Sequence, residues 1–281
     1  MDAISLSNGI SMPTIGFGVY QIPQGREGEQ AIRTAIDIGY RMFDTAQAYG
    51  NEDSVGNAIA QSGIARKEFF IITKVWVSNT GEEKAYNSIH KSLQKLRTDY
   101  IDLLLIHQPF GDYYGAYRAI ERAYKEGLTK AIGVSNFFPD RFIDLAYFVE
   151  ILPMVNQMEA HVFNQQKELT AIMKEYGTML MSWGPFAEGK NNFFTNETLV
   201  SIGKQYEKSS AQVALRFLLQ QGIPVIPKSI HKERMQENFN ICDFELTAKD
   251  MEKLKALDME RSLFFSHYSP ETVRMMLNHK V

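Results

Sequence analysis

Four polar side chains lie at or near the ends of apolar segments, where their types and spacing could carry out acid–base chemistry. Asp44 and Lys74 end the runs MetPheAsp and IleIleThrLys, and His107 follows LeuLeuLeuIle. Tyr49 lies five residues after Asp44, in the loop TyrGlyAsnGlu. A charge at the edge of an apolar strand needs a partner of opposite sign. Asp44 and Lys74 are therefore expected to pair, either as a structural ion pair or as part of a catalytic site.

The chemistry open to these four residues is the protonation of an oxygen atom. The Lys74 ammonium is expected to favour the phenolate and bring the Tyr49 pKa closer to the working range. His107 either is a structural group or, held neutral by apolar neighbours, donates a hydrogen bond to a substrate oxygen. Together the four provide an acid, a cation, a carboxylate that holds the cation and a hydrogen-bond donor. This is the set that protonates a carbonyl oxygen when hydride reaches its carbon. Because no side chain supplies hydride, the set predicts a nicotinamide cofactor.

A basic segment, residues 226–238, offers a site for a phosphate group. It ends a predicted strand and opens a predicted helix, whose first N–H groups are free to bind an anion. Lys228 and Lys232 add positive charge. Ser229 with Arg234 suits a terminal phosphate monoester such as the 2′-phosphate of NADP. The alternative is an ordinary solvated start of a helix.

The elements that must position these residues are short apolar strands alternating with amphipathic helices. Eight strands are predicted, at residues 14–17, 41–44, 69–75, 101–107, 131–134, 154–157, 179–183 and 224–227. The helix predicted over 82–96 shows the apolar spacing of an amphipathic helix, since Ala85, Ile89 and Leu93 recur every four residues and share one face. Eight units of about 35 residues fit an α/β fold of the (β/α)8 TIM-barrel type. An open doubly wound sheet is the alternative.

Two features favour the barrel, as a single domain over residues 1–281. No linker rich in Gly, Ser or Pro divides the chain. The cluster GlyPheGly (16–18) lacks the third glycine and the acidic residue of a dinucleotide fingerprint. In a barrel the chemistry gathers at the carboxyl ends of the strands. Besides the residues already named, that rule selects Ser135, Asn136, Gln157 and Trp183.

Further elements are predicted at both ends of the barrel. Residues 4–13 alternate around Asn8-Gly9, which predicts an N-terminal β-hairpin with a type I′ turn. Extra helices are predicted near the C-terminus, over 197–206, 209–220 and 246–258. Thr247 is expected to cap the last of them.

Charge and composition narrow the classes of partner. The net charge is −3, which argues against nucleic acid as the main ligand because phosphates demand a basic field. A single cysteine, Cys242, favours a reducing compartment. The amino terminus has no signal-peptide pattern, and no segment is long and apolar enough to span a bilayer. The protein is expected to be cytoplasmic, without a membrane partner.

The motifs together resemble the aldo-keto reductase family over nearly the whole chain. The similar segments are, in order, GlyTyrArgMetPheAspThrAlaGlnAlaTyrGlyAsnGlu (39–52), LeuLeuIleHis (104–107), GlyValSerAsnPhe (133–137), ValAsnGlnMetGlu (155–159) and IleProLysSer (226–229) with Arg234 and Asn238. Within the family the chain looks like the bacterial branch similar to 2,5-diketo-D-gluconate reductases.

The resemblance implies a barrel that binds NADP(H) without a Rossmann domain and reduces an aldehyde or ketone to an alcohol, as an NADP-dependent oxidoreductase acting on CH–OH donors. It implies a catalytic tetrad, with Tyr49 as general acid, made of Asp44, Tyr49, Lys74 and His107. The cofactor contacts that it implies are Ser135, Asn136 and Gln157 at the carboxamide, Trp183 under the nicotinamide ring, Lys228, Ser229 and Arg234 at the 2′-phosphate, and Glu237 with Asn238 at the adenine.

Departures from the family pattern bear on the substrate. Gln108 stands where tryptophan is frequent, and His231 stands where some relatives have threonine near the phosphate. The loops after the fourth and seventh strands and the tail after Asp258 are short, which predicts an open, shallow mouth. Small polar aldehydes, dicarbonyls such as methylglyoxal, or keto sugars fit such a mouth. Its expected lining is Tyr20, Trp76 and Phe110, with Phe264 or His267 as further candidates, although Trp76 and Phe110 could equally be core.

Two other functions are open. A barrel that binds NADP(H) as a regulator or sensor with little turnover would keep the same fold. A metal-dependent barrel hydrolase needs clustered ligands, but the six histidines show no paired spacing at a strand end, and His161 with Glu159 comes nearest. No metal is therefore predicted. The family resemblance also implies a monomer.

Overall fold

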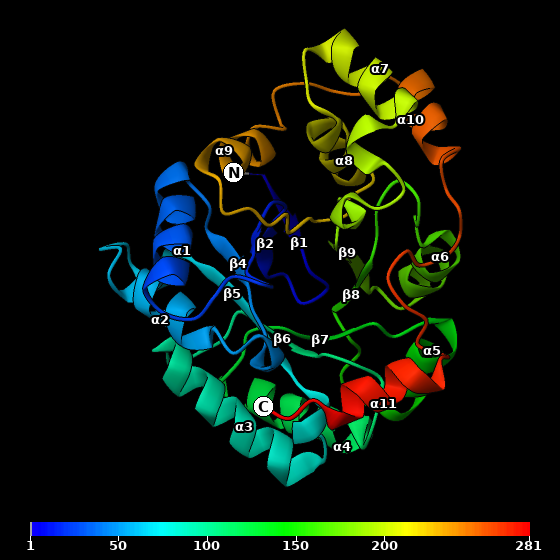
Figure 1. Ribbon diagram of the computed structural model, residues 1–281. Helices are drawn as coiled ribbons and strands as arrows, with labels where there is room; N and C mark the ends of the chain where they lie inside the picture. Colours follow the sequence, from blue (N-terminus) through cyan, green and yellow to red (C-terminus); the bar gives the residue numbers. More distant parts are fainter. Residues whose placement is uncertain (1) are drawn as a thin grey trace.

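Seven short parallel strands at the centre of the molecule run in sequence order around a curled sheet, each connected to the next by at least one helix on the outside (Figure 1). The structure is a computed structural model that describes residues 2–281. It confirms the predicted (β/α)8 barrel. The strands of the sheet are β3 (Phe17–Gly18), β4 (Met42–Asp44), β5 (Phe70–Val75), β6 (Leu103–Ile106), β7 (Ile132–Ser135), β8 (Val155–Glu159) and β9 (Met179–Trp183).

The eighth strand position is occupied by irregular chain, so the predicted strand at 224–227 is wrong as a regular strand. Val225 alone pairs in parallel with Ile15 on one side and with Ser182 on the other. Its N–H donates to Thr14 O at 2.9 Å, and its carbonyl accepts from Gly16 N at 2.8 Å. Residues 224 and 227 are prolines, which have no N–H to donate. The barrel is therefore closed by single pairings at Val225.

The helices cover the outside of the sheet, because apolar residues recur along one face of each. Helix α3 begins and ends where the sequence predicts, and Ala85, Ile89 and Leu93 are buried. The helices are α1 (Arg26–Ile38), α2 (Glu52–Ala60), α3 (Glu82–Leu96), α4 (Tyr113–Lys125), α5 (Pro139–Phe148), α6 (Lys167–Glu175), α7 (Glu197–Tyr206), α8 (Ser210–Leu219), α9 (Lys232–Phe239), α10 (Ala248–Lys255) and α11 (Pro270–Asn278). Among residues 2–281 no helix is long and apolar enough to cross a membrane.

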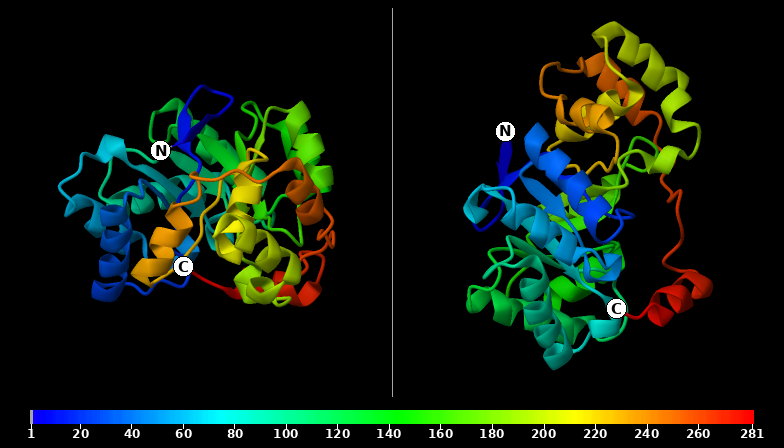
Figure 2. Two further views of the ribbon diagram at one scale, coloured as in Figure 1. Left: turned by 90° about the horizontal axis from the view of Figure 1, so that it is seen from above. Right: turned by 60° about the vertical axis from the view of Figure 1, so that its left-hand side comes forward.

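The N-terminal hairpin lies at the end of the barrel opposite helix α11 (Figure 2). Strands β1 (Ala3–Ser5) and β2 (Ser11–Pro13) pair antiparallel, as predicted. The predicted type I′ turn is wrong. That turn needs positive φ at two adjacent residues, whereas in this loop only Gly9 has it, at +84°. Gly9 N donates to Leu6 O and Leu6 N to Ile10 O, which gives a three-residue loop ending in a left-handed glycine.

The C-terminal tail, residues 259–281, runs along the rim of the barrel past α6 and α5 and carries a helix that the sequence analysis missed (Figure 1). Thr247 caps α10 as predicted, accepting from Asp250 N at 3.2 Å. Helix α11 begins with a similar signal, because the Ser269 side chain caps it and Pro270 is its first residue. Met276 of α11 is buried against the barrel. The tail therefore belongs to the end of the barrel where the strand-end side chains lie.

Candidate active site

A buried ion pair lies at the carboxyl end of strands β4 and β5. Lys74 Nζ contacts Asp44 Oδ1 at 2.6 Å, and neither side chain is more than 2% exposed. Asp44 Oδ2 accepts from Gln157 Nε2 at 2.7 Å, and Lys74 Nζ also donates to Thr45 O at 2.9 Å. Burial lowers the pKa of Lys74 from its ordinary value, while the Asp44 carboxylate opposes that change. The structure thus forms the pair that the sequence predicts.

Tyr49 ends the short 3-10 helix η1 (Gln47–Tyr49) and is half-buried. Its hydroxyl lies 3.5 Å from Lys74 Nζ, and its ring centroid lies 5.6 Å from that of His107. Burial, the Asp44 charge and Tyr20 raise the pKa of Tyr49 well above its ordinary value. The direction is opposite to the expected lowering, because burial has the largest influence on this pKa. At neutral pH the Tyr49 hydroxyl keeps its proton.

His107 follows β6 and is buried beside the tyrosine. Its Nδ1 atom has no hydrogen-bond partner within residues 2–281. Burial holds the pKa of His107 well below its ordinary value, and the charges of Lys74 and His279 act in the same direction. The imidazole is therefore neutral at physiological pH, as the second of its two predicted roles requires, and can donate one hydrogen bond.

The side chains at the ends of β7, β8 and β9 form a continuous chain of hydrogen bonds that reaches the ion pair. Trp183 Nε1 donates to Asn136 Oδ1 at 2.9 Å, and Asn136 Nδ2 donates to Ser135 Oγ at 3.1 Å. Ser135 Oγ donates to Gln157 O at 2.9 Å, and the Gln157 side chain donates to Asp44. Asn136 has φ of +64°, a left-handed conformation that asparagine tolerates. The four predicted residues thus lie together with Asp44.

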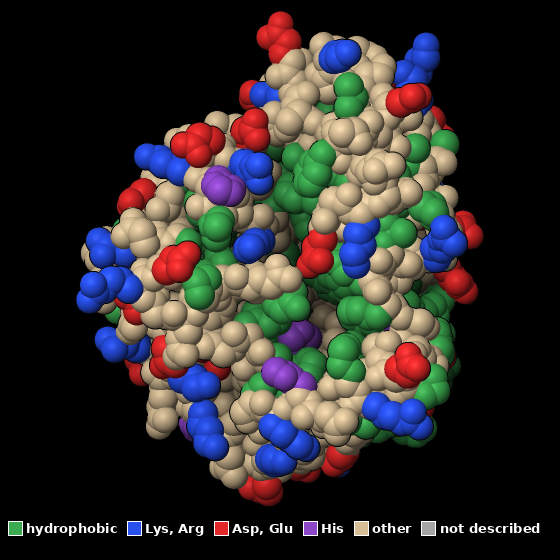
Figure 3. Space-filling model, viewed as in Figure 1, with side chains coloured by type: hydrophobic (Ala, Val, Ile, Leu, Met, Phe, Trp, Pro, Cys, Tyr) green, Lys and Arg blue, Asp and Glu red, His purple; other side chains and the backbone are tan. Residues whose placement is uncertain are grey.

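The basic segment lies along the same end of the barrel, where Figure 3 shows Lys or Arg and His side chains over α9, beside a groove that leads to the central hollow. Within the described residues, no ion pair involves Lys228, Lys232 or Arg234. Ser229 Oγ accepts from His231 N at 3.1 Å. The positive charge of this segment is therefore available to an anion.

The remaining residues of the segment differ in exposure. His231 precedes α9, is exposed and gives its helix no side-chain cap. Glu237 is exposed, whereas Asn238 is buried on the inner face of α9. Of the two predicted adenine contacts, the Glu237 side chain is therefore open to solvent and the Asn238 side chain is not.

The tail forms part of the wall of the mouth, while the open, shallow shape of the mouth stays a prediction. Tyr20 is 54% exposed, and its ring centroid lies 5.0 Å from that of Tyr49. Trp76 is buried, and its Nε1 donates to His279 O at 2.8 Å. Phe110 is partly buried, with its ring stacked on His267. Contacts between residues so far apart in sequence leave no local pattern, so the sequence does not predict that the tail packs on Trp76.

Gln108 and His267 join the tail to the end of β6. His267 Nε2 lies 2.8 Å from Gln108 Oε1, and its Nδ1 has no partner among the described residues. Burial lowers the pKa of His267 to about 4, with the charge of Glu159 opposing. Gln108, which stands where tryptophan is frequent in the family, is therefore hydrogen-bonded to His267 of the tail.

We expect the tail contact to make the protein acid-sensitive. The folded pKa of His267, about 4, lies below the usual value of 6.5, so the unfolded chain binds the proton more tightly. This contribution to stability is present above about pH 6.5 and is lost as the pH falls toward about 4, reaching about 2–3 kcal/mol. Thermal melting at about pH 7 and about pH 5 should show a smaller acid loss in His267→Gln than in the wild type; an equal loss contradicts the assignment.

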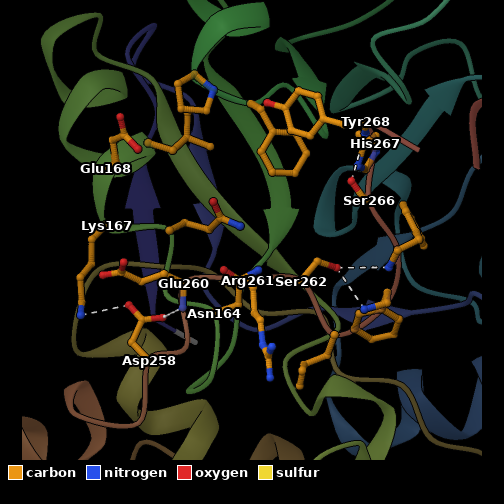
Figure 4. Close-up of a pocket in the computed structure, with 17 residues that line it drawn as sticks. Asn164, Lys167, Glu168, Asp258, Glu260, Arg261, Ser262, Ser266, His267 and Tyr268 are labelled. Atoms are coloured by element: carbon orange, nitrogen blue, oxygen red, sulfur yellow. Dashed lines mark hydrogen bonds and ion pairs between the residues drawn. The ribbon is translucent and has the colours of Figure 1, made fainter. Parts of the chain in front are cut away.

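A cavity of about 710 Å³ lies beneath the tail, between residues 258–268 and the starts of α5 and α6 (Figure 4). Lys167 pairs with Asp258 at 3.0 Å on one side of it, and Ser266 and His267 lie on the other. The cavity contains none of the four residues Asp44, Tyr49, Lys74 and His107. This cavity is therefore separate from the candidate chemistry.

Glu159 and His161, the nearest approach to a ligand pair in the sequence, hold the tail. His161 Nε2 lies 3.0 Å from Glu159 Oε1, which also accepts from Leu263 N at 2.9 Å. Ser262 Oγ donates to the other carboxylate oxygen. No cluster of three or more His, Cys, Asp or Glu side chains that could hold a metal ion is present in residues 2–281.

The family of the chain follows from the sequence match as well as from this arrangement. The model of the aldo/keto reductase family matches residues 14–259. The chain belongs to the aldo/keto reductase family. This confirms the resemblance at the level of the family, while the branch similar to 2,5-diketo-D-gluconate reductases stays a prediction.

Named relatives in this family include bacterial enzymes. The chain is 45% identical to the glyoxal reductase of Bacillus subtilis over 260 residues, which cover 92% of this chain and 94% of that protein. It is 38% identical to the methylglyoxal reductase DkgA of Yersinia pestis, covering 92% and 94%.

Solved structures agree with the fold. The aldo/keto reductase of Brucella melitensis has a TM-score of 0.88 at 39% identity, covering 92% of this chain and 99% of that chain. The aldo-keto reductase of Bombyx mori, solved in complex with NADP, has a TM-score of 0.86 at 31% identity, covering 92% and 94%.

Proposed function

We propose that the protein uses NADPH to reduce small aldehydes and α-dicarbonyls such as glyoxal and methylglyoxal to alcohols, with Tyr49 as general acid. The observation that carries the proposal is the contact of the buried Asp44–Lys74 pair with the Tyr49 hydroxyl, beside a neutral histidine. The glyoxal and methylglyoxal reductases among the relatives support the substrate class.

The cofactor is NADP(H), which supplies hydride to the carbonyl carbon when bound. The residues present fit it. Ser135, Asn136 and Gln157 offer amide and hydroxyl groups at the end of the site beside Asp44, and the Trp183 indole provides an apolar face there. At the other end Lys228, Ser229 and Arg234 would take the 2′-phosphate, with Glu237 and Asn238 at the adenine. The cations there have no carboxylate partner in the described chain, which favours an anionic ligand.

Tyr49 would deliver the proton to the substrate oxygen. Its hydroxyl keeps its proton at neutral pH, so the proton is present for transfer, and the alkoxide formed by hydride addition is basic enough to take it. As the proton leaves, the phenolate oxygen would gain negative charge 3.5 Å from Lys74 Nζ. The ammonium stabilises that charge, and Asp44 holds the ammonium in place with both of its carboxylate oxygens already bonded.

His107 would orient the same oxygen. As a neutral imidazole it donates a hydrogen bond without competing as an acid. Its ring packs against Trp76 at a centroid distance of 4.9 Å, so apolar contacts fix its direction. With Tyr20 and Phe110 nearby, the mouth would suit a small carbonyl compound. The tail that forms part of its wall would hinder the binding of a bulky one.

Turnover tests the proposal against a barrel that binds NADP(H) only as a sensor. We expect purified protein to oxidise NADPH when methylglyoxal is added, followed by the absorbance of the reduced nicotinamide. Cofactor binding measured by fluorescence, without consumption for any member of a panel of aldehydes, dicarbonyls and keto sugars, would favour the sensor and contradict the enzyme.

Arg234→Ala should separate the two nicotinamide cofactors. Loss of one charge-assisted bond to the 2′-phosphate is expected to raise the Michaelis constant for NADPH by about 10–100-fold. The constant for NADH should stay within about twofold, since NADH lacks that phosphate. Arg118→Ala is a matched control, because Arg118 is exposed on α4 and pairs only with Glu82. Equal effects on both cofactors would remove the phosphate assignment.

A further inference from the structure

The three-residue helix η1 carries Tyr49 but has few means of its own to hold that residue still. Its backbone makes single-turn hydrogen bonds, Tyr49 N to Ala46 O and Gly50 N to Gln47 O. A 3-10 turn of this length has weak internal geometry. Ala48 has no polar side chain, and the Tyr49 hydroxyl touches Lys74 only at 3.5 Å. From outside, His279 Nε2 lies 3.4 Å from Ala48 O, and within η1 the Gln47 side chain makes the shorter hydrogen bonds to neighbouring elements.

Gln47 is buried, with 5% of its surface exposed, and both ends of its amide are bonded. Its Nε2 donates to Ser88 Oγ at 3.0 Å and to Ser92 Oγ at 3.2 Å, both on α3. Its Oε1 accepts from Trp76 N at 3.0 Å and from Asn79 Nδ2 at 2.9 Å. A single side chain therefore ties η1 to a helix and to the chain that leaves β5.

The serine on α3 is itself oriented to receive this bond. Ser88 Oγ donates to Ala85 O at 2.7 Å, so its lone pairs remain for the Gln47 amide. The flanks of the loop are fixed separately, since Thr45 Oγ1 donates to Asn51 Oδ1 at 2.8 Å and Asn51 Nδ2 donates to Val19 O at 2.8 Å. In the middle of the loop, where Tyr49 lies, the shorter hydrogen bonds to other elements are those of Gln47.

The partner of Gln47 on the other side is the backbone of Trp76. Trp76 follows β5, two residues after Lys74, and its ring packs against His107. The bond to Trp76 N thus fixes the spacing between the proposed proton donor and the residue that supports the histidine. Placement of reacting groups matters steeply, because an error of about 1 Å can cost about 100-fold in rate.

We propose that Gln47 is a positioning residue, which holds Tyr49 at a fixed distance from Trp76 and His107 through its bonds to Ser88, Ser92 and Trp76. The role that it supports, proton donation by Tyr49, rests on the proposed function. The fixed geometry of the loop does not, because it is a property of the folded chain.

The test compares two buried glutamines. Gln47→Met keeps the length of the side chain and removes its hydrogen bonds. Gln165→Met is the matched control, because Gln165 is also 5% exposed and its Nε2 donates to Val162 O and Leu254 O, on the loop before α6 and away from Tyr49. The conservative variant Gln47→Glu keeps the acceptor for Trp76 N and Asn79.

Turnover is the first readout. We expect Gln47→Met to lower kcat for methylglyoxal by about 100-fold, with an increased solvent isotope effect, while the dissociation constant of NADPH stays within about twofold. Gln165→Met should leave kcat and the isotope effect near the wild-type values, and Gln47→Glu should recover at least about tenfold of the loss. Equal falls in kcat for the two methionine variants would overturn the proposal.

Amide hydrogen exchange is the second readout and needs no turnover. In Gln47→Met, exchange should become faster at residues 47–50 and at Trp76, and stay unchanged there in Gln165→Met. If exchange in this loop does not change, Gln47 does not position Tyr49, whatever the protein catalyses. If exchange changes as expected but Tyr49→Phe keeps full turnover, the proposed function fails and the anchoring role stands.

Discussion

Tyr49→Phe is expected to lower kcat for methylglyoxal by about 10²–10⁴-fold, the usual contribution of a positioned general acid. The substitution removes the hydroxyl and nothing else from a ring that already packs between Tyr20 and His107. The Lys74 ammonium then has no phenolate oxygen to stabilise during proton transfer. The measurement is steady-state oxidation of NADPH, with cofactor affinity followed separately by fluorescence.

The dissociation constant of NADPH should change little in this variant, because Tyr49 is not among the proposed cofactor contacts. Tyr117→Phe is the control for loss of a buried phenol, since the Tyr117 hydroxyl donates to Ile151 O at 2.9 Å beneath α4 and should matter for stability alone. Turnover by Tyr49→Phe equal to that of Tyr117→Phe would mean that another group supplies the proton.

Lys74→Met is expected to destabilise the fold by about 3–5 kcal/mol, because Asp44 is left buried without its cation. The same variant should lose turnover, since the ammonium beside Tyr49 is gone. Thermal or chemical unfolding measures the first effect, and NADPH oxidation measures the second.

A double variant separates the two effects of Lys74. Adding Asp44→Asn removes the unpaired charge and should restore most of the lost stability, since the asparagine oxygen can still accept from Gln157 Nε2. Turnover should stay low in the double variant. Recovery of turnover along with stability would show that Lys74 acts only as structural support.

Much of the site could be predicted because it lies at strand ends. An apolar run ending in a polar residue marks such a position, and Asp44, Lys74 and His107 each follow this pattern. The parallel strands then bring their ends together without further information. Helix α3 was predicted to the residue for a similar reason, since its period is strong and uninterrupted.

The errors have a different physical origin. The pKa of Tyr49 is raised chiefly by burial, which depends on the whole fold and has no local sequence pattern. Gln47 was missed because a glutamine in a loop has no pattern that separates an anchor from a solvated side chain. The hydrogen bond from Trp76 Nε1 to His279 O joins residues 203 positions apart, so no local pattern predicts it.

The single-domain division over residues 1–281, the cytoplasmic location, the monomeric state and the lack of a nucleic-acid partner stay predictions. The residue roles in cofactor and substrate binding stay proposals until the variants described above are measured.

The seam of the barrel at Val225 has a thermodynamic consequence. Single pairings with Ile15 and Ser182 close the sheet there, so local opening should cost less free energy at the seam than between regular strands. Lys228 and Ser229 follow directly after it. A ligand that binds Lys228 and Ser229 only while the seam is closed adds its binding free energy to the free energy that opening requires. The ligand therefore stabilises the part of the sheet that opens first. Cofactor concentration would then set how often the barrel opens, and with it the resistance of this segment to proteases.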